Sequence, residues 1–271
     1  MNELDYNNAE GIRRSDLWKM EDSPEKFRYF LEHPAEQTPA MAFGSACHKY
    51  ILEPEGFDSE YVIAPKFDRR TNDGKAAYEA FMAVNGTKTF VSEADLAVMM
   101  EMANAIDRCP LAQKLLRGKG EIESAFFWVD RDTGERCKIK TDRLVKFRRR
   151  WCIVDYKTAQ FADTFRFNSE MWKLGYYYQA GMYTEGVQMA KGLRRRPDFV
   201  FVVQEKKPPY SVNVIDATEE VIRAGNIKFH ELLEKYHACK VVDQWPGYIS
   251  GNVPNDSFVP TWAEREMEDE L

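Results

Sequence analysis

Hydrophobic residues follow two different spacings along the chain, and the change between them falls near residue 120. Before it, apolar residues recur at helical spacing, and several of these segments follow a serine that is typical of a helix N-cap. The helices predicted in this part cover residues 16–20, 24–33, 43–52, 73–85 and 92–116. The first part of the chain is therefore predicted to be helical.

After residue 120, apolar and polar residues alternate, which is typical of strands with one buried face. Three such runs predict an antiparallel meander, and two later runs predict further strands. The predicted strands cover residues 121–130, 136–147, 151–158, 199–204 and 210–215, and the predicted helices between and after them cover 169–189 and 218–237. We therefore expect an α/β fold with a central mixed β-sheet flanked by helices. It should form one domain over 1–263, with a helical part at 12–116 and a sheet core at 121–240.

Composition agrees with one large folded domain. Of the 271 residues, 44% are hydrophobic and 13% are aromatic, and no low-complexity tract interrupts them. No apolar run reaches the roughly 18 residues that a membrane span needs, and the first residues lack the apolar core of a signal peptide. We therefore expect a cytoplasmic protein without a membrane partner.

The five cysteines are too scattered for a metal cluster or a disulfide framework. No C-x-x-C pair occurs among them, which argues against a zinc knuckle and an iron-sulfur cluster. We expect buried free thiols, and we interpret Cys152 and the aromatic run 176–178 as core packing. The cysteines are Cys47, Cys109, Cys137, Cys152 and Cys239.

The distribution of charge is more informative than its total. A net charge of −6 fits poorly with a protein coated in basic residues for nucleic acid. The last eight residues, 264–271, carry five acids against one arginine and are predicted to form a tail, whereas positive charge gathers in two short runs. Those runs are either solvated loops or a DNA-binding path. As a DNA-binding path they would contribute Arg148, Arg149, Arg150, Arg194, Arg195 and Arg196.

One apolar strand ends in two opposite charges. In the run IVDYKT, residues 153–158, side chains alternate, so Asp155 and Lys157 point to the same face. Asp142 ends the run KIKTD on the preceding strand, and antiparallel pairing would bring its carboxylate beside Asp155. Two neighbouring carboxylates repel each other unless a cation lies between them, and magnesium or manganese prefers such oxygen ligands. The alternative is a strand-end salt bridge between Asp155 and Lys157.

The spacing of these residues resembles the core of PD-(D/E)XK nucleases. Twelve residues separate Asp142 from Asp155, and Lys157 follows two positions later, which is the acid, acid-x-lysine pattern of that family. The sequence QAGMY at residues 179–183 matches the Q-x-x-x-Y motif of the RecB-like branch. Upstream, His48 matches the histidine found in that branch.

The chain also resembles RecE-type exonucleases (exonuclease VIII) and their phage relatives, over most of residues 12–185. This resemblance implies a restriction-endonuclease-like core that binds two Mg²⁺ (or Mn²⁺) ions per site. It also implies the residues that do the chemistry. The implied metal ligands are His48, Asp142, Asp155 and the backbone carbonyl of Tyr156, and the implied catalytic residues are Asp142, Asp155, Lys157, Gln179, Tyr183 and Glu123.

The resemblance gives these residues roles, and each has a plainer alternative. Lys157 would orient or help to deprotonate the attacking water, while Gln179 and Tyr183 would brace the site or contact DNA. Glu123 would be an outer contact to metal or water. Taken alone, His48 would more often be a hydrogen-bonded core group, the glutamine and tyrosine would be ordinary helix residues, and Glu123 would pair with a basic residue.

Together these implications predict a metal-dependent exonuclease that degrades linear double-stranded DNA in the 5′-to-3′ direction during phage-type recombination. Relatives of this type work as ring-shaped oligomers beside a single-strand annealing recombinase, so we expect a homo-oligomeric ring and such a partner. Two alternatives stay open. One is a structure-specific or single-strand nuclease on the same core, and the other is a catalytically silent DNA-binding protein.

Overall fold

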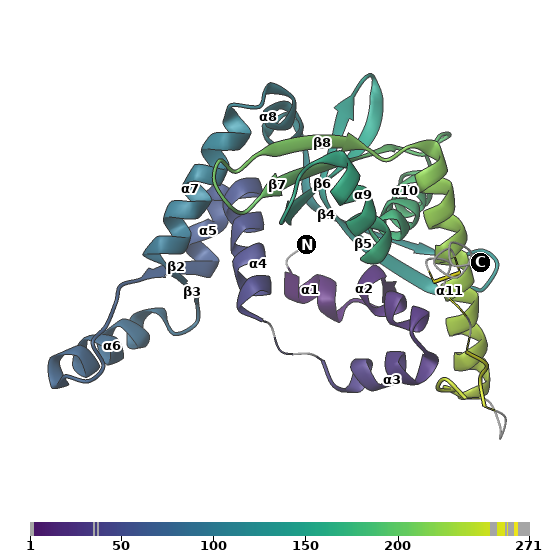
Figure 1. The fold of residues 1–271 in the computed structure, drawn as a ribbon, viewed down its shortest axis with the longest axis horizontal. Helices are drawn as coiled ribbons and strands as arrows, with labels where there is room; N and C mark the ends of the chain where they lie inside the picture. The colour runs from purple at the N-terminus through teal and green to yellow at the C-terminus, as the bar shows by residue number, and fades with distance from the viewer. Residues whose placement is uncertain are drawn as a thin grey trace.

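A mixed β-sheet of six strands lies at the centre of the protein, and helices cover both of its faces (Figure 1). This computed structural model describes residues 3–34, 36, 38–249, 254–257, 259 and 263–264. Of the predicted acidic tail, residues 265–271 lie outside the described residues. The strands of the central sheet are β1 (Ile12–Arg13), β4 (Gly120–Val129), β5 (Arg136–Phe147), β6 (Arg150–Ala159), β7 (Asp198–Glu205) and β8 (Val212–Asp216).

The predicted central mixed sheet with flanking helices is confirmed. The meander predicted from the alternating pattern consists of β4, β5 and β6, which pair antiparallel in that order. β7 runs parallel to β6, because α9 (Thr164–Lys173) and α10 (Tyr176–Lys191) carry the chain back between these two strands. β8 then pairs antiparallel with β7.

β5 and β6 separate partway along their length. Their last paired residues are Arg143 and Val154. Beyond this point the short strand β1 pairs with β5, and β6 is paired only with β7 among the described strands. Asp142 and Asp155 are the next residues on each strand, so they lie where the two strands part. Backbone groups there are not used by the ladder and can bond to side chains instead.

Two hydrophobic cores lie on opposite faces of the sheet. Along β6 the side chains alternate between them, with Ile153 in the first core and Val154 and Tyr156 in the second. α10 and α11 (Glu219–Val242) pack against the first core, and the other helical layer packs against the second, as Figure 1 shows. That second layer is formed by α4 (Pro39–Leu52), α7 (Glu93–Asp107) and α8 (Pro110–Arg117).

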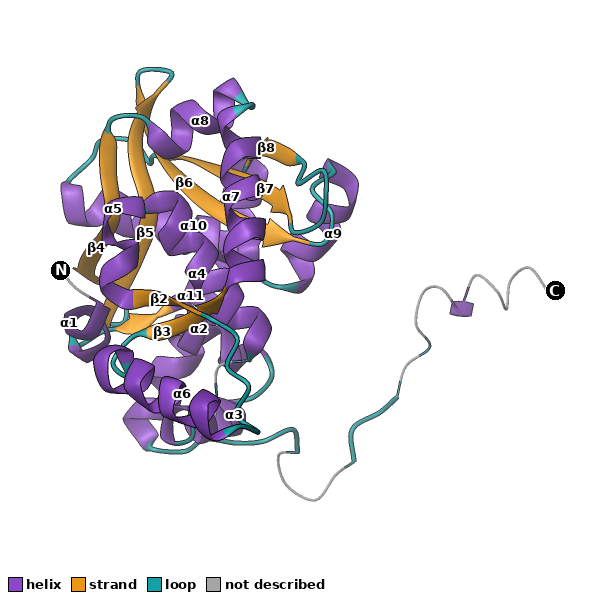
Figure 2. Cartoon of the chain, turned by 90° about the vertical axis from the view of Figure 1, so that its left-hand side faces the viewer, coloured by secondary structure: helices purple, strands orange, loops and turns teal. Residues whose placement is uncertain are grey.

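The part of the chain before β4 is mostly helical, as predicted. It also contains a two-stranded parallel sheet that the hydrophobic pattern did not predict. Beside this sheet, α6 (Asn72–Asn85) projects from the rest of the molecule in Figure 1, and Figure 2 shows it next to β2 (Tyr61–Ala64) and β3 (Thr89–Ser92). None of the residues of α6 is buried. The remaining elements are α1 (Glu3–Asn8), α2 (Arg14–Leu17), the 3₁₀ helix η1 (Trp18–Glu21), α3 (Pro24–Glu32), α5 (Pro54–Glu60), β2 (Tyr61–Ala64), α6 (Asn72–Asn85) and β3 (Thr89–Ser92).

Three predicted helix boundaries are wrong. Ser15 was the predicted N-cap of the helix over 16–20. It is not one, because α2 begins one residue before it and has no side-chain cap. The helix predicted over 92–116 is broken, because Pro110 cannot continue a helix and instead opens α8. The helix predicted over 169–189 is two helices separated at Gly175, whose φ of +67° lies in the left-handed region.

Two further predictions concern the cysteines and the membrane. All five cysteines are free, as predicted; four of them are buried as expected, and Cys109 is only half-buried. Burial raises the pKa of the Cys47 thiol to about 12, so it stays protonated at neutral pH. Within the described part of the chain, no helix is both long enough and apolar enough to span a membrane.

Candidate active site

Three carboxylates line up across neighbouring strands where β5 and β6 part. The register places Glu123 of β4 opposite Asp142 of β5, and the same row continues to Asp155 of β6. Glu123 has a φ of +46°, in the left-handed region, and the ladder between β4 and β5 is interrupted at this row. Three acidic residues therefore share one row at a break in the sheet's hydrogen bonding.

Asp142 is held by the backbone of the neighbouring strand. Its Oδ2 accepts a 2.7 Å hydrogen bond from the Tyr156 N–H, a donor that the parting strands leave available, and lies 3.5 Å from His48 Nε2. Burial raises the pKa of the Asp142 carboxyl to about 7; His48 opposes this rise, whereas Asp155 adds to it. A cation bound at this point would favour the charged form.

α4 brings His48 to the same point from the opposite face of the sheet. Its Nε2 forms a 2.7 Å hydrogen bond with the carbonyl oxygen of Tyr156. Because a carbonyl oxygen only accepts, Nε2 carries the proton in this arrangement. One ligand-capable atom each from His48, Glu123 and Asp142 lie within 4.8 Å of one another. The alternative of an ordinary core histidine explains the hydrogen bond but leaves the adjacent carboxylates unexplained.

Asp155, Lys157 and Gln179 form a closed set of polar contacts. Lys157 Nζ lies 2.7 Å from Asp155 Oδ2 and donates a 3.1 Å hydrogen bond to Gln179 Oε1. Gln179 Nε2 in turn donates to Asp155 Oδ1. The Asp155 side chain is only 2% exposed, so this pair is a buried one and differs from the exposed strand-end salt bridge considered as an alternative.

The donor set fits a hard divalent cation. Asp155 Oδ2 is buried and, among the described residues, has no aligned hydrogen-bond donor, although Lys157 Nζ lies close to it. A buried carboxylate oxygen without a full set of partners is unfavourable unless a cation satisfies it. Asp142 and the Tyr156 carbonyl supply further oxygens, and His48 can add a nitrogen. A set dominated by oxygen suits Mg²⁺ or Mn²⁺.

Glu123 sits at the margin of this set. Its Oε2 forms a 2.8 Å ion pair with Lys140, which is the plain alternative that the sequence allowed. The same carboxylate also lies with His48 and Asp142 within metal-binding distance. The structure therefore brings Glu123 to the site and at the same time gives it a partner of its own.

Two tyrosines of α10 complete the surroundings of the site. Tyr183 lies one helical turn after Gln179, and burial raises the pKa of its hydroxyl well above the usual 10, with Asp155 adding to the rise. The ring of Tyr176 lies 4.7 Å from Lys157 Nζ. Tyr176 packs against the core, as predicted, and in addition contacts this lysine. The sequence signal that could have placed Tyr176 beside the site is its position three residues before Gln179, because this spacing puts both side chains on one face of the helix.

Most of the predicted basic positions lie at the other end of the sheet. Arg150 begins β6, five residues or about 16 Å from Asp155. Arg148 and Arg150 are held in ion pairs of 3.0 and 2.9 Å with acids on β8 and β7. Arg149 and residues 194–195 are exposed. Their positions do not place these arginines at the catalytic row, the row of Glu123, Asp142 and Asp155. DNA binding by these arginines elsewhere on the surface stays a prediction.

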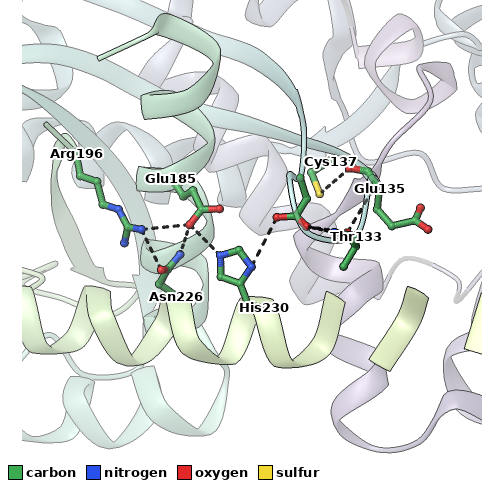
Figure 3. Close-up of polar contacts among 8 residues, drawn as sticks. Thr133, Glu135, Cys137, Glu185, Arg196, Asn226 and His230 are labelled. Atoms are coloured by element: carbon green, nitrogen blue, oxygen red, sulfur yellow. Dashed lines mark hydrogen bonds and ion pairs between the residues drawn. The ribbon is translucent and has the colours of Figure 1, made fainter. Parts of the chain in front are cut away.

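Arg196 belongs to a network at the junction of α10 and α11 (Figure 3). Its guanidinium lies 3.2 Å from Glu185 Oε2 and 3.0 Å from Asn226 Oδ1. Asn226 also donates to Glu185, and His230 Nε2 lies 3.1 Å from the same carboxylate. Glu185 is only 8% exposed. These contacts give Arg196 a structural role, and its contact with DNA stays a prediction.

This network makes stability depend on pH. The hydrogen bond to Glu185 raises the pKa of His230 above its ordinary 6.5. Burial would raise the pKa of Glu185, but hydrogen bonds from His230 and Asn226 outweigh it and lower this pKa below 4.5. The contribution of His230 to stability is complete below pH 6.5 and is lost as the pH rises through the pKa that this histidine has in the folded protein. The glutamate's is present above pH 4.5 and is lost as pH falls. The pair therefore stabilises most between these limits.

We expect His230→Gln to lower the free energy of unfolding by about 1–2 kcal/mol between pH 5 and 6, and by clearly less at pH 8. The reason is that the wild-type imidazolium pairs with Glu185 only while it is protonated. Urea unfolding at the two pH values measures the difference. His33→Gln, at an exposed position after α3, is the control and should show no such pH dependence. A loss of stability that is equal at both pH values would contradict the assignment.

The fold and the site together define a class of protein. Acids and a lysine meet where two strands of a mixed sheet part, with helices on both faces, and this is the restriction-endonuclease-like arrangement of PD-(D/E)XK proteins. A family model described as "PDDEXK-like domain of unknown function (DUF3799)" matches residues 14–254, and the chain belongs to this family. The predicted class is confirmed. The RecE-like branch and the phage origin stay predictions.

A solved structure shows the same fold. A crystal structure of a "Putative exonuclease" from Eubacterium rectale superposes with a TM-score of 0.59 at 14% sequence identity, and the match covers 96% of each chain. The crystal structure of SSO0001 has a TM-score of 0.33 at 11% identity, covers 73% of this chain and 94% of that one, and is too distant to support an argument. No curated protein matches the sequence.

Proposed function

We propose that the protein is a metal-dependent exonuclease that hydrolyses linear double-stranded DNA from its ends in the 5′-to-3′ direction. The convergence of Asp142, Asp155 and Lys157 at one point of the sheet carries this proposal. Family membership supports a nuclease, and the Eubacterium rectale protein of the same fold is described as a "Putative exonuclease". The direction of degradation rests on the resemblance to RecE-type exonucleases.

The chain's own residues supply position and charge for hydrolysis. A divalent metal ion held by Asp142, Asp155 and the Tyr156 carbonyl would supply Lewis acidity and lower the pKa of a water molecule. Lys157 Nζ is fixed by Asp155 and Gln179, so it can orient the attacking water and stabilise negative charge that develops on the phosphate. Gln179 is a positioning residue, because it holds both charged groups and need not touch the substrate.

His48 must change its tautomer before it can bind a metal ion. Nε2 now donates to the Tyr156 carbonyl, so the lone pair lies on Nδ1. When the proton moves to Nδ1, Nε2 and the carbonyl oxygen become two free ligands 2.7 Å apart. These two atoms would then be available, together with the Asp142 carboxylate, to hold a hard divalent ion. The hydrogen bonds of the Tyr156 backbone with His48 and Asp142 thus keep these groups side by side.

Digestion of end-labelled DNA tests the proposed function. With Mg²⁺, linear duplex labelled at one 5′ end should release its label early as a short product, and the same duplex labelled at the 3′ end should release it late. Closed circular duplex should stay intact, and nothing should be cut in EDTA. Cleavage of the circle or of single strands alone would indicate a structure-specific or single-strand nuclease. Binding without cleavage under every condition would indicate a silent DNA-binding protein.

We also propose that the protein forms a homo-oligomeric ring in the cytoplasm and works beside a single-strand annealing recombinase. The support for this is the RecE-type resemblance, together with a net charge of −6, which suits an acidic outer surface around a DNA-binding interior. Light scattering after gel filtration should give a mass several times the 31.6 kDa of one chain. A monomer at all concentrations would contradict the ring.

A further inference from the structure

A cavity of about 570 Å³ opens at the edge of the sheet, apart from the catalytic row. Its walls are the end of α8, the start of β4, and the strand ends on either side of the β5–β6 turn. Phe147 and Trp151 give it two aromatic surfaces, and both side chains are half-buried. A cavity of about 300–1,000 Å³ is the usual size for a small-molecule or cofactor site.

The rim of this cavity is positively charged. Lys114, Lys119 and Lys146 line it, all three are exposed, and none pairs with an acid in the part of the chain that the structure describes. Glu121, the acid in the lining, is neutralised by Lys191 at 2.7 Å. A local excess of unpaired positive charge in a protein of net charge −6 indicates an anionic ligand.

Lysine ammonium groups lie over the aromatic rings of the cavity. Lys146 Nζ lies 3.9 Å from the centre of the Trp151 ring, and Lys191 Nζ lies 5.2 Å from it. Lys114 Nζ lies 5.9 Å from the Phe147 ring. These contacts show that the ring faces can be approached by polar groups from the rim. An exposed lysine side chain can move off the ring face, so that a base can stack there. The same movement can bring the lysine ammonium to a phosphate.

We propose that this cavity binds nucleotides of a DNA single strand, with a base stacked on Trp151 or Phe147 and the phosphates held by the three rim lysines. Proteins that bind single strands without sequence preference combine a positive groove with aromatic platforms in this way. The inference rests on the proposed function, because the strand is taken to be that of the DNA being degraded. Val145 of the cavity lies three residues from Asp142 along β5. That separation is about 10 Å along the strand.

The salt dependence of single-strand binding tests the lysines. The ligand is a short fluorescein-labelled oligothymidylate, and fluorescence anisotropy is measured in excess EDTA so that metal-dependent cleavage cannot occur. Each lost phosphate contact should reduce the slope of log K against log salt by about 0.7, so replacing three lysines should reduce it by about two units. An unchanged slope would overturn the proposal. The rim variant combines Lys114→Gln, Lys119→Gln and Lys146→Gln.

A matched variant removes the same charge from exposed positions on other surfaces and should keep the wild-type slope. An equal loss of slope in this control would mean that charge acts non-specifically, which would also overturn the proposal. The control combines Lys75→Gln, Arg131→Gln and Arg223→Gln.

Two substitutions of Trp151 test the stacking. Trp151→Phe and Trp151→Leu both lose the indole, but only phenylalanine keeps a flat ring face, so the leucine variant should bind the oligothymidylate roughly 10-fold more weakly than the phenylalanine variant. Equal binding by the two variants would overturn the stacking. Tighter binding of an oligoglutamate peptide than of the oligothymidylate, by the wild type but not by the rim variant, would identify an acidic protein segment as the occupant and overturn the proposal.

Failure of this inference can be separated from failure of the proposed function. Cleavage of linear duplex in Mg²⁺ is measured on the same wild-type preparation. Normal cleavage together with an unchanged slope in the rim variant would overturn the cavity proposal alone. A reduced slope in a protein that cuts no DNA would support the cavity and overturn the proposed function.

Discussion

Asp155→Asn is expected to abolish Mg²⁺ binding and to lower the rate of DNA cleavage by on the order of 1000-fold or more. Asparagine keeps the size of the side chain and an oxygen for the hydrogen bond from Gln179, but it lacks the charge that a hard divalent cation requires. The variant should stay folded, because Lys157 retains its hydrogen bond to Gln179. Calorimetric titration with Mg²⁺ and single-turnover cleavage measure the two effects.

Asp130→Asn is the matched control for this substitution. Asp130 is a carboxylate only 4% exposed, and it lies with Glu185 and His230 in a second group whose ligand-capable atoms are within 4.8 Å of one another. The guanidinium of Arg196 beside Glu185 disfavours a metal ion in that group. The control should therefore bind Mg²⁺ and cut DNA as the wild type does. If Asp155→Asn were fully active, the nuclease assignment of this site would fail.

The part of the site that could be predicted from the residues lies within the hairpin formed by β5 and β6. Asp155 and Lys157 share a face because side chains alternate along a strand, and antiparallel pairing places Asp142 in the adjacent row. These relations are local. The contact of His48 with Tyr156 joins residues 108 positions apart, and it depends on how α4 packs across the sheet, so only the resemblance to a family could suggest it.

The same distinction holds for the fold. The N-caps at Ser23 and Ser92 were predictable, because a serine side chain bonds to the backbone three residues later whatever the rest of the chain does. The strands β1, β2 and β3 have two to four residues and are too short to show an alternating pattern. Charge runs are uninformative for a related reason. Arg196 follows two exposed arginines in sequence, yet its partners come from α10 and α11.

Lys157→Ala is expected to lower the cleavage rate by on the order of 100-fold or more while metal binding survives. The ammonium lies 2.7 Å from Asp155 Oδ2 and 3.1 Å from Gln179 Oε1, so it stands beside the expected metal ligands without being one of them. Its loss removes a group that can orient the attacking water and stabilise charge on the phosphate. It also makes the field at the carboxylates more negative, so Mg²⁺ affinity should be retained or should rise.

Lys157→Ala also breaks a buried ion pair, and this provides a second measurement. Asp155, at 2% exposed, would lose its cation, which should cost the metal-free protein about 3 kcal/mol of unfolding free energy. Mg²⁺ should restore much of that loss, because it binds the folded state through the same carboxylate. The control is Lys240→Ala, which removes the 2.6 Å partner of Glu135, a side chain 9% exposed on another surface. That variant should lose stability that Mg²⁺ does not restore, and it should cut DNA normally.

The combination of three measurements on Lys157→Ala decides what the lysine does. Normal cleavage with reduced stability would make the pair with Asp155 purely structural, since the chemical step would proceed without the ammonium. Lost Mg²⁺ binding would mean that the lysine organises the carboxylates. Slow cleavage with retained Mg²⁺ binding, and with stability that Mg²⁺ restores, is the result we expect. Only a group that acts on the water or the phosphate, beside an intact ligand set, gives that combination.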